Sequence, residues 1–200
     1  EDEYRDMLTN AVEDLRANYL TADKVGNMAA QYSAVVKPYL YSSPDVENAR
    51  EEDPAVYDQL VSSLAGEVEE NYQYYLESLE KPWPFFVSTP VAEDGKINAL
   101  WEAAYDTDGE DITYRVVLAR DYDYTDVIYQ ADGLQLPEVS FDMLPAGQYY
   151  LKVQAVNESG YVQDCYDYYS REDGGGKAYG TKAFVVQADG TITNVDNADV

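Results

Sequence analysis

The stretch from Leu144 to Ala155 limits most strongly what this chain can fold into, because its side chains alternate along the chain. One face carries the apolar set Tyr149, Leu151, Val153 and Ala155. The other face carries Tyr150, Lys152 and Gln154. A period of two with one apolar face is typical of a half-buried β-strand, and the Pro-Ala-Gly segment before it predicts a turn. Such a strand needs partner strands.

The second half of the chain supplies those partners and predicts a β-sandwich of about seven strands. Trp101 shares an inward register with Ile97, so we place Trp101 and Tyr149 in one core. Tyr150 lies on the opposite face, where it should contribute much less to stability. A turn at Asp189-Gly190 predicts a short return strand. The predicted strands are 85–88, 96–105, 112–118, 126–130, 139–141, 149–155, 181–187 and the return strand 191–193.

Three apolar stripes with helical spacing precede the β half. The first covers residues 4–19, and the second covers residues 25–39 with Thr21 as a helix N-cap and Pro38 near its end. The third begins with Asp53 as N-cap before a proline, and its stripe continues to Leu79. Because each stripe needs a partner, we predict a small three-helix packing unit.

The expected fold class is therefore α+β in two segregated parts. Residues 1–81 form the helical unit, residues 82–193 form the β-sandwich, and residues 194–200 form an acidic tail. The boundary lies at Pro82-Trp83-Pro84, because proline cannot continue a helix and a Pro-x-Pro segment makes a stiff, extended connection.

Charge and composition exclude several classes of function. The chain has 39 acidic and 13 basic residues, for a net charge of −26, which argues against a nucleic-acid partner and favours cationic partners or divalent ions. There is no histidine, which excludes histidine-based acid–base catalysis and histidine metal ligands. Cys165 is the only cysteine, so no internal disulfide forms. No apolar run is long enough for membrane insertion.

Two segments of the β half resemble a known domain family. Leu144 to Ala155, followed by Asn157-Glu158-Ser159-Gly160, is similar to the E–F corner and F strand of bacterial fibronectin type III-like domains. Leu100 to Tyr114 resembles the B strand, the acidic B–C turn and the C strand of that family. The resemblance covers roughly half of the chain and implies an Ig-like sandwich. It says little about function, because such modules host many binding roles.

The order of parts resembles the C-terminal end of spore-coat CotH-like proteins, in which an atypical kinase-like domain ends in helices. The matching pieces are Tyr4-Arg5, Val36-Lys37-Pro38-Tyr39-Leu40 and the long helix before Lys81. The resemblance implies ATP-dependent phosphoryl transfer by a parent protein whose nucleotide-binding residues lie upstream of this chain. The chain itself has no Gly-rich phosphate loop followed by a helix and no Asp-Phe-Gly segment, so we expect no enzyme activity from it.

Two acidic turns are candidate metal sites. Asp106, Asp108 and Asp111 crowd one turn together with Glu110, and oxygen ligands at this density can hold Ca²⁺. The spacing does not match an EF-hand, and the alternative is a polar turn shaped by Gly109. A second acidic turn contains Asp121, Asp123 and Asp126. No other cofactor is expected.

The segment 162–180 is expected to be a long loop, and loops of this length often carry function. Its tyrosines offer an apolar face and a polar tip, which suits sugars or protein surfaces. The candidate binding residues are Tyr166, Tyr168, Tyr169 and Tyr179.

These patterns together predict a non-catalytic C-terminal fragment of a CotH-like surface or secreted protein, with the sandwich as a docking or protein-binding module. One alternative is an independent adhesin module that binds glycan or protein. Another is a parent protein kinase whose active site lies upstream. The expected location is the cell surface or exterior of a bacterium. The expected partners are a protein or glycan there, or the upstream kinase-like domain of the parent.

Overall fold

The computed structural model describes residues 2–171 and 174–195, which divide between two compact units. The first unit is Glu1–Ser78 and contains the helices, and the second is Leu79–Val200 and contains the strands. Helices followed by an antiparallel β-sandwich-like arrangement are confirmed as the architecture. Of the predicted acidic tail, residues 196–200 lie outside the described residues.

The helical unit contains α1 (Asp2–Asn18), α2 (Ala22–Leu40), the short 3₁₀ helix η1 (Asp45–Asn48) and α3 (Pro54–Leu79). The hydroxyl of Thr21 accepts a hydrogen bond from the backbone N–H of Lys24 at 3.3 Å, which caps α2 as predicted. The carboxylate of Asp53 accepts from the backbone N–H of Ala55 at 2.8 Å and starts α3. Pro38 is accommodated inside the last turn of α2.

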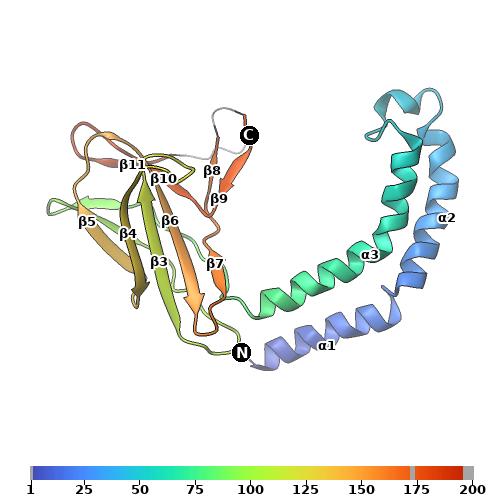
Figure 1. Cartoon of the computed structure of the whole chain (residues 1–200), viewed down its shortest axis with the longest axis horizontal. Helices are drawn as coiled ribbons and strands as arrows, with labels where there is room; N and C mark the ends of the chain where they lie inside the picture. Colours follow the sequence, from blue (N-terminus) through green and yellow to red (C-terminus); the bar gives the residue numbers. More distant parts are fainter. Residues whose placement is uncertain (1, 172–173, 196–200) are drawn as a thin grey trace. The chain divides into compact units, whose positions relative to one another are not determined.

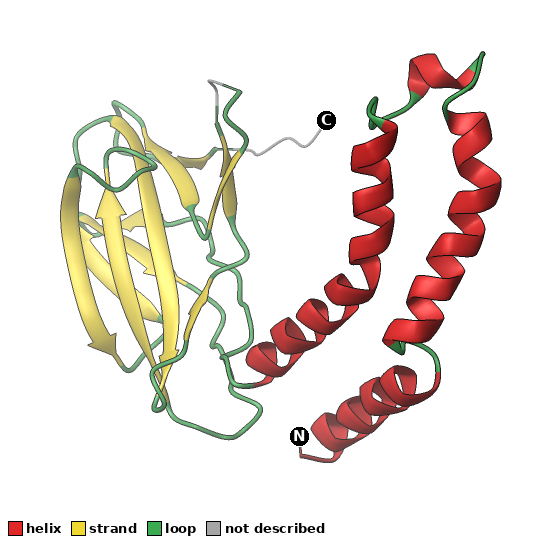
Figure 2. Ribbon diagram, turned by 45° about the vertical axis from the view of Figure 1, so that its right-hand side comes forward, coloured by secondary structure: helices red, strands yellow, loops and turns green. Residues whose placement is uncertain are grey.

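The three predicted helices form, and they pack as an open pair of layers (Figures 1 and 2). α1 lies beside one half of α3 and α2 beside the other half. The Arg16 guanidinium on α1 binds the Glu69 carboxylate at 2.7 Å, and Lys37 on α2 binds Asp58 at 2.5 Å. No described side chain within residues 3–80 is buried, because each stripe meets only one neighbour.

In the described residues of the second unit, the strands form two main antiparallel sheets and one hairpin. The smaller sheet has the order β1-β2-β5, with β1 (Val91–Glu93), β2 (Lys96–Leu100) and β5 (Glu138–Asp142). The larger has the order β11-β10-β6-β3-β4, with β7 also paired to β6. Its strands are β3 (Ile112–Ala119), β4 (Val127–Leu134), β6 (Gly147–Asn157), β7 (Val162–Asp164), β10 (Lys182–Val186) and β11 (Ile192–Asn194). The hairpin joins β8 (Tyr168–Ser170) and β9 (Lys177–Tyr179).

The main core lies between the two sheets and confirms the predicted register. Trp101 is 5% exposed and Tyr149 is 3% exposed, and both belong to one cluster of buried residues. Their rings meet further aromatics, Trp101 against Tyr114 at 5.3 Å and Tyr149 against Phe184 at 5.8 Å between ring centroids. The return strand predicted after Asp189-Gly190 also forms, as β11 beside β10.

The first predicted strand, 85–88, was only partly right. Phe85 and Val87 are buried in the main core, but the segment joins its neighbour through the isolated bridge between Val87 and Trp101. Regular pairing in this part of the chain begins at β1. The backbone N–H of Phe86 donates to the Glu102 carboxylate at 3.1 Å and that of Val87 donates to the Asp167 carboxylate at 2.7 Å, so side chains take two donors of this segment.

Tyr150 lies on the opposite face of β6 as predicted, but the small contribution to stability expected there does not fit the structure, because a second core covers this face. Tyr150 is 8% exposed and stands opposite Ala183 of β10. Tyr169 of β8 packs edge-on against Tyr150 at 5.0 Å, and Tyr122 from the β3–β4 loop does so at 6.0 Å. The segment 162–180, expected to be a loop, thus contains strands β7, β8 and β9, and β8 supplies the cover over Tyr150.

Candidate functional site

An open apolar groove between α2 and α3 is the most distinctive surface of the helical unit. Its volume is about 450 Å³. It forms because the stripes of the two helices face one another without closing. The groove is lined by Tyr19, Leu20, Val25, Met28, Ala29, Tyr32, Ser33, Val36, Tyr57, Val61, Leu64 and Val68.

Large apolar side chains of this groove remain exposed. Tyr32 is 68% exposed and Met28 is 57% exposed, and both lie on α2. On α3, Leu64 is also exposed. Contiguous exposed apolar side chains of this kind mark binding surfaces in soluble proteins, whereas single exposed residues need no explanation. The groove is therefore a candidate docking surface.

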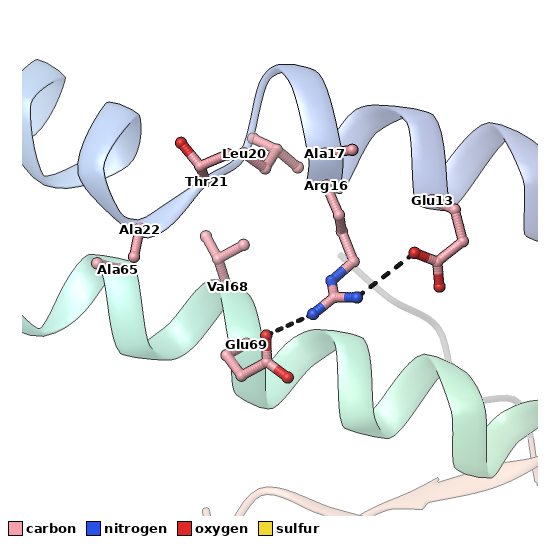
Figure 3. A pocket seen from close by; sticks show the side chains of 9 residues that line it. All are labelled: Glu13, Arg16, Ala17, Leu20, Thr21, Ala22, Ala65, Val68 and Glu69. Atoms are coloured by element: carbon pink, nitrogen blue, oxygen red, sulfur yellow. Dashed lines mark hydrogen bonds and ion pairs between the residues drawn. The ribbon is translucent and has the colours of Figure 1, made fainter.

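A polar pocket of about 350 Å³ adjoins the groove where α1 gives way to α2 (Figure 3). Leu20 and Val68 line both cavities. Arg16 extends from α1 toward α3, where it binds Glu69 at 2.7 Å, and it lies 3.5 Å from Glu13 on its own helix. The hydrogen bond from Arg16 is the main cause that lowers the pKa of the Glu69 carboxyl. Two carboxylates thus share one guanidinium at this end of the groove.

Arg16 also lies over an aromatic ring, with its guanidinium carbon 3.4 Å from the ring centroid of Tyr72. The hydroxyl of Tyr72 in turn donates to Glu13. A cation over a tyrosine face and between two acids is held in place by several weak interactions at once. We interpret this set as a clamp between α1 and α3 that fixes one end of the groove.

The predicted tyrosine site is not one platform in the structure. Tyr169 is buried in the second core. Tyr166 is 58% exposed and stacks on Phe86 at 5.3 Å between ring centroids. Tyr168 and Tyr179 face each other across the β8–β9 hairpin at 6.1 Å, with the Lys177 ammonium 3.9 Å from the Tyr168 ring centroid. The outer tyrosines therefore offer two separate exposed aromatic pairs.

The first acidic turn uses its carboxylates in structural hydrogen bonds. Asp106 is buried and accepts from the side-chain amide of Asn157 at 2.9 Å and from the backbone N–H of Asp108 at 2.8 Å. Glu110 accepts from the hydroxyl of Ser159 at 2.5 Å. Among the described residues, no group of three or more acidic or cysteine side chains is arranged to hold a metal ion. The Ca²⁺ site proposed for Asp106, Asp108 and Asp111 stays a prediction.

The second acidic turn is also held together by its own hydrogen bonds. The Asp121 carboxylate accepts from the hydroxyl of Thr125 at 2.6 Å and from its backbone N–H at 2.8 Å, which lowers the pKa of Asp121. Asp126 pairs with Arg120 at 3.2 Å. Both carboxylates shape the β3–β4 loop, which carries Tyr122 into the second core.

Comparisons with known proteins leave the family open. No family model matches this chain, and no curated protein matches it either. Among solved structures, the chain is similar to the twitchin kinase region from C. elegans, at 17% identity and a TM-score of 0.32. The match covers 56% of this chain and 20% of that chain. We draw nothing from a match with so low a TM-score, and none of the comparisons supports the CotH-like resemblance.

Two further findings concern the helices and the single cysteine. None of the helices in the described residues is both long and apolar enough to cross a membrane. Cys165 is buried, and burial raises the pKa of its thiol to about 12. Because the thiolate is the reactive form, this cysteine is a poor nucleophile near neutral pH.

The sequence does not show where the groove lies. The apolar stripes of residues 4–19, 25–39 and 56–79 predict that each helix has an apolar face, but not which parts of these faces stay open. The lengths of the three helices bear on where the groove forms. α3 has 26 residues and is longer than α1 with 17 or α2 with 19, so part of each shorter helix can lie beside it.

Proposed function

We propose that this chain is a non-catalytic docking module whose helical unit holds an apolar helical segment of a partner protein. The observation that carries the proposal is the open α2–α3 groove, lined by apolar side chains from both helices. An amphipathic helix laid into an apolar groove is a recurring mode of protein recognition. Each aliphatic or aromatic side chain that a partner fully buries contributes about 1.5–3 kcal/mol before the entropic cost of association.

We assign the β unit to the fibronectin type III-like class. Three observations support this assignment. The segments matched to strands B, C and F become β2, β3 and β6, and β2 lies in a different sheet from β3 and β6. Strand β5 pairs with β2 as strand E pairs with B in Ig-like sandwiches, and β10 lies beside β6 as G lies beside F. The hydroxyl of Tyr149 donates to the Pro145 carbonyl at 2.8 Å, in the manner of a tyrosine corner.

For the parent protein, we retain the CotH-like resemblance as a proposal that rests on sequence motifs. In that case the parent is a bacterial surface or secreted protein, and its upstream kinase-like domain would carry any ATP-dependent protein kinase activity. That same domain is one source of a helix for the groove. No site in the described residues of this chain is assigned a catalytic role.

Binding of a neutral amphipathic helix tests the docking proposal. We would titrate the ¹⁵N-labelled full chain with a peptide of about 18 residues that has a Leu stripe and Gln elsewhere. Amide shifts should concentrate at Val25, Met28, Val61 and Leu64. Met28→Glu should weaken binding at least about tenfold, because it places a charge in the apolar lining.

The matched control is Asn27→Glu, which adds the same charge one residue earlier on α2, where Asn27 does not line the groove. It should leave the affinity almost unchanged. Circular dichroism of both variants checks that the helices persist. Shifts confined to the β unit, or no binding of the peptide, would contradict the proposal.

A glycan-binding adhesin is the second candidate, favoured by the exposed stack of Tyr166 on Phe86. Sugars bind on such aromatic faces, since an apolar ring can cover the C–H face of a pyranose. A glycan array with the full chain and with Tyr166→Ala tests it. A glycan signal that disappears in the variant would support the adhesin function, and an array without signal would reject it.

A further inference from the structure

We infer that the natural occupant of the α2–α3 groove is a basic amphipathic helix of a partner protein, with an apolar stripe flanked by Lys or Arg. The inference rests on the docking function proposed above and adds the chemistry of the partner. It depends on the charges around the groove, on their existing pairing, and on the length of the apolar lining.

The α3 wall of the groove carries only negative charge. α3 contains no Lys or Arg in its whole length. Tyr57 and Val68 line the groove, and their sequence neighbours Asp58, Glu67 and Glu69 are acidic. With about 100° of rotation per residue, these neighbours lie at the edges of the apolar stripe. A helix seated on the stripe would place its own flanking side chains beside these carboxylates.

The cations of the helical unit that lie near the groove are already engaged within it. On α2, Lys24 donates to the backbone carbonyl of Asn18, and Lys37 binds Asp58. On α1, Arg16 binds Glu69. Glu67, by contrast, accepts its hydrogen bond from the neutral hydroxyl of Ser63 at 2.7 Å. Glu13 is also near the groove, so its edges carry four carboxylates against the three cations Lys24, Lys37 and Arg16, an excess of one negative charge.

The excess carboxylate lies in the polar pocket beside Leu20 and Val68, at one end of the groove. There the carboxylates of Glu13 and Glu69 share the single guanidinium of Arg16, as Figure 3 shows. An additional Lys or Arg from a partner would bring the charges in this pocket into balance. We therefore expect a basic residue near the end of the bound helix that lies over this pocket.

Charge also argues against the other occupants of an apolar groove. A second copy of the chain would bring another net charge of −26, and like charges oppose association. An anionic membrane surface is disfavoured for the same reason. A cationic helix gains both apolar burial and electrostatic attraction.

The lining defines the size of the partner segment. On α2 it runs from Val25 to Val36, which at 1.5 Å per residue is about 17 Å, or about three helical turns. A segment of about 12–18 residues with apolar groups at i, i+4, i+7 and i+11 matches this length.

Three peptides with one Leu stripe and different flanks test the inference on the full chain by fluorescence anisotropy. The flanks are Lys, Gln or Glu, and a fourth peptide has the Lys composition in scrambled order. We expect the Lys peptide to bind about tenfold more tightly than the Gln peptide, and the Glu peptide to bind more weakly than both. Raising NaCl from about 50 to 300 mM should remove most of the Lys advantage.

Two variants locate the effect on α3. Glu67→Gln, at the edge of the stripe, should reduce the advantage of the Lys peptide and leave the Gln peptide unchanged. Glu70→Gln removes the same charge from the side of α3 that faces away from the apolar stripe and should change neither affinity.

The possible outcomes test the basic partner and the docking function separately. Equal binding of the Lys and Gln peptides overturns the basic partner and leaves the docking function standing. Binding of no striped peptide overturns both. Equal binding of the scrambled Lys peptide shows general attraction to an acidic protein, and a dimer that forms through the groove in solution shows a second copy as occupant. Either of these results overturns the inference.

Discussion

Tyr149 shows how one side chain joins two parts of the β unit. Its ring lies in the main core against Phe184, while its hydroxyl reaches back to the Pro145 carbonyl at 2.8 Å. The hydrogen bond therefore ties the turn before β6 to the strand itself. Both interactions depend on the register of β6, because a slip by one residue would turn Tyr149 to the other face.

We expect Tyr149→Phe to lower the free energy of unfolding by about 1 kcal/mol, since it removes the hydrogen bond and keeps the ring. Urea unfolding followed by tryptophan fluorescence measures the change. Tyr166→Phe is the matched control, because the exposed Tyr166 has a ring contact with Phe86 and should change stability by less than about 0.5 kcal/mol. Equal effects of the two substitutions would argue against the tyrosine corner.

Tyr150 carries a second prediction at the scale of one residue. We expect Tyr150→Ala to cost about 3 kcal/mol, because it leaves a cavity between Tyr169 and Tyr122. Tyr166→Ala serves as the exposed comparison and should cost much less. Urea denaturation at constant pH measures both. If Tyr150→Ala unfolds no more easily than Tyr166→Ala, the second core contributes little.

Cys165 makes stability depend on pH in the alkaline range. Burial raises the pKa of its thiol from the ordinary value of 9.0 to about 12, so the folded state keeps the proton longer than the unfolded state. The unfolded chain then binds fewer protons, and stability falls as pH rises from about 9 to 12. We expect Cys165→Ala to reduce this fall, which urea unfolding at pH 8, 9 and 10 would reveal.

A slope that is unchanged in Cys165→Ala would assign the alkaline loss of stability to other groups. Alkylation gives an independent measurement. At pH 8 the native thiol should react with iodoacetamide far more slowly than the thiol in urea, because the thiolate is nearly absent in the folded state.

At the scale of elements, the turn from β9 to β10 requires a glycine, because it passes close to a neighbouring strand. Gly180 has a φ of +69°, and a Cβ atom there would lie 2.9 Å from the Cβ of Asp164 in β7. The turn thus passes close to β7, which itself pairs with β6. The turn that follows the β8–β9 hairpin thus lies next to the larger sheet.

We expect Gly180→Ala to destabilise the β unit by about 2–3 kcal/mol, through positive φ and through the collision with Asp164. Gly190→Ala is the matched control, because Gly190 also has positive φ (+84°) and no neighbouring atom within 4 Å of the added Cβ. It should cost about 1 kcal/mol. Thermal unfolding followed by tryptophan fluorescence compares them, and similar losses would remove the steric part of the explanation.

At the scale of the whole molecule, the two units differ in how they are stabilised. The β unit has a core in which Ile97, Leu118 and Leu151 are fully buried. The helical unit has no buried side chain among the described residues 3–80 and is held by ion pairs and half-buried contacts. Exposed ion pairs contribute little each, so the helical unit should be the less stable one.

We therefore expect stepwise unfolding, with helical circular dichroism at 222 nm lost at lower temperature than the tryptophan signal from the β unit. A helix that fills the groove should raise the first transition and leave the second unchanged, because a ligand stabilises the state that binds it. One coincident transition at both wavelengths would contradict the independence of the units.

Features that depend on neighbours in sequence were predictable. The inward register of Trp101 and Tyr149 follows from alternation over a few residues, and the starts of α2 and α3 follow from Thr21 and Asp53 as caps. In each case the deciding interactions lie within about five residues, so the local pattern contains them. The antiparallel sandwich-like arrangement could be predicted for the same reason, since its strands each show one apolar face.

Features that depend on distant segments could not be derived in this way. Tyr150 alternates outward as predicted, yet it is buried because Tyr169 and Tyr122, from other parts of the chain, meet over it. The apolar stripe of α3 has the same pattern as that of a helix in a closed core. It nevertheless forms one wall of an open groove, because α1 and α2 each lie beside only part of α3. Alternation and helical period set the direction of a side chain. Which surface covers that side chain is decided when remote elements pack, and neither pattern contains that information.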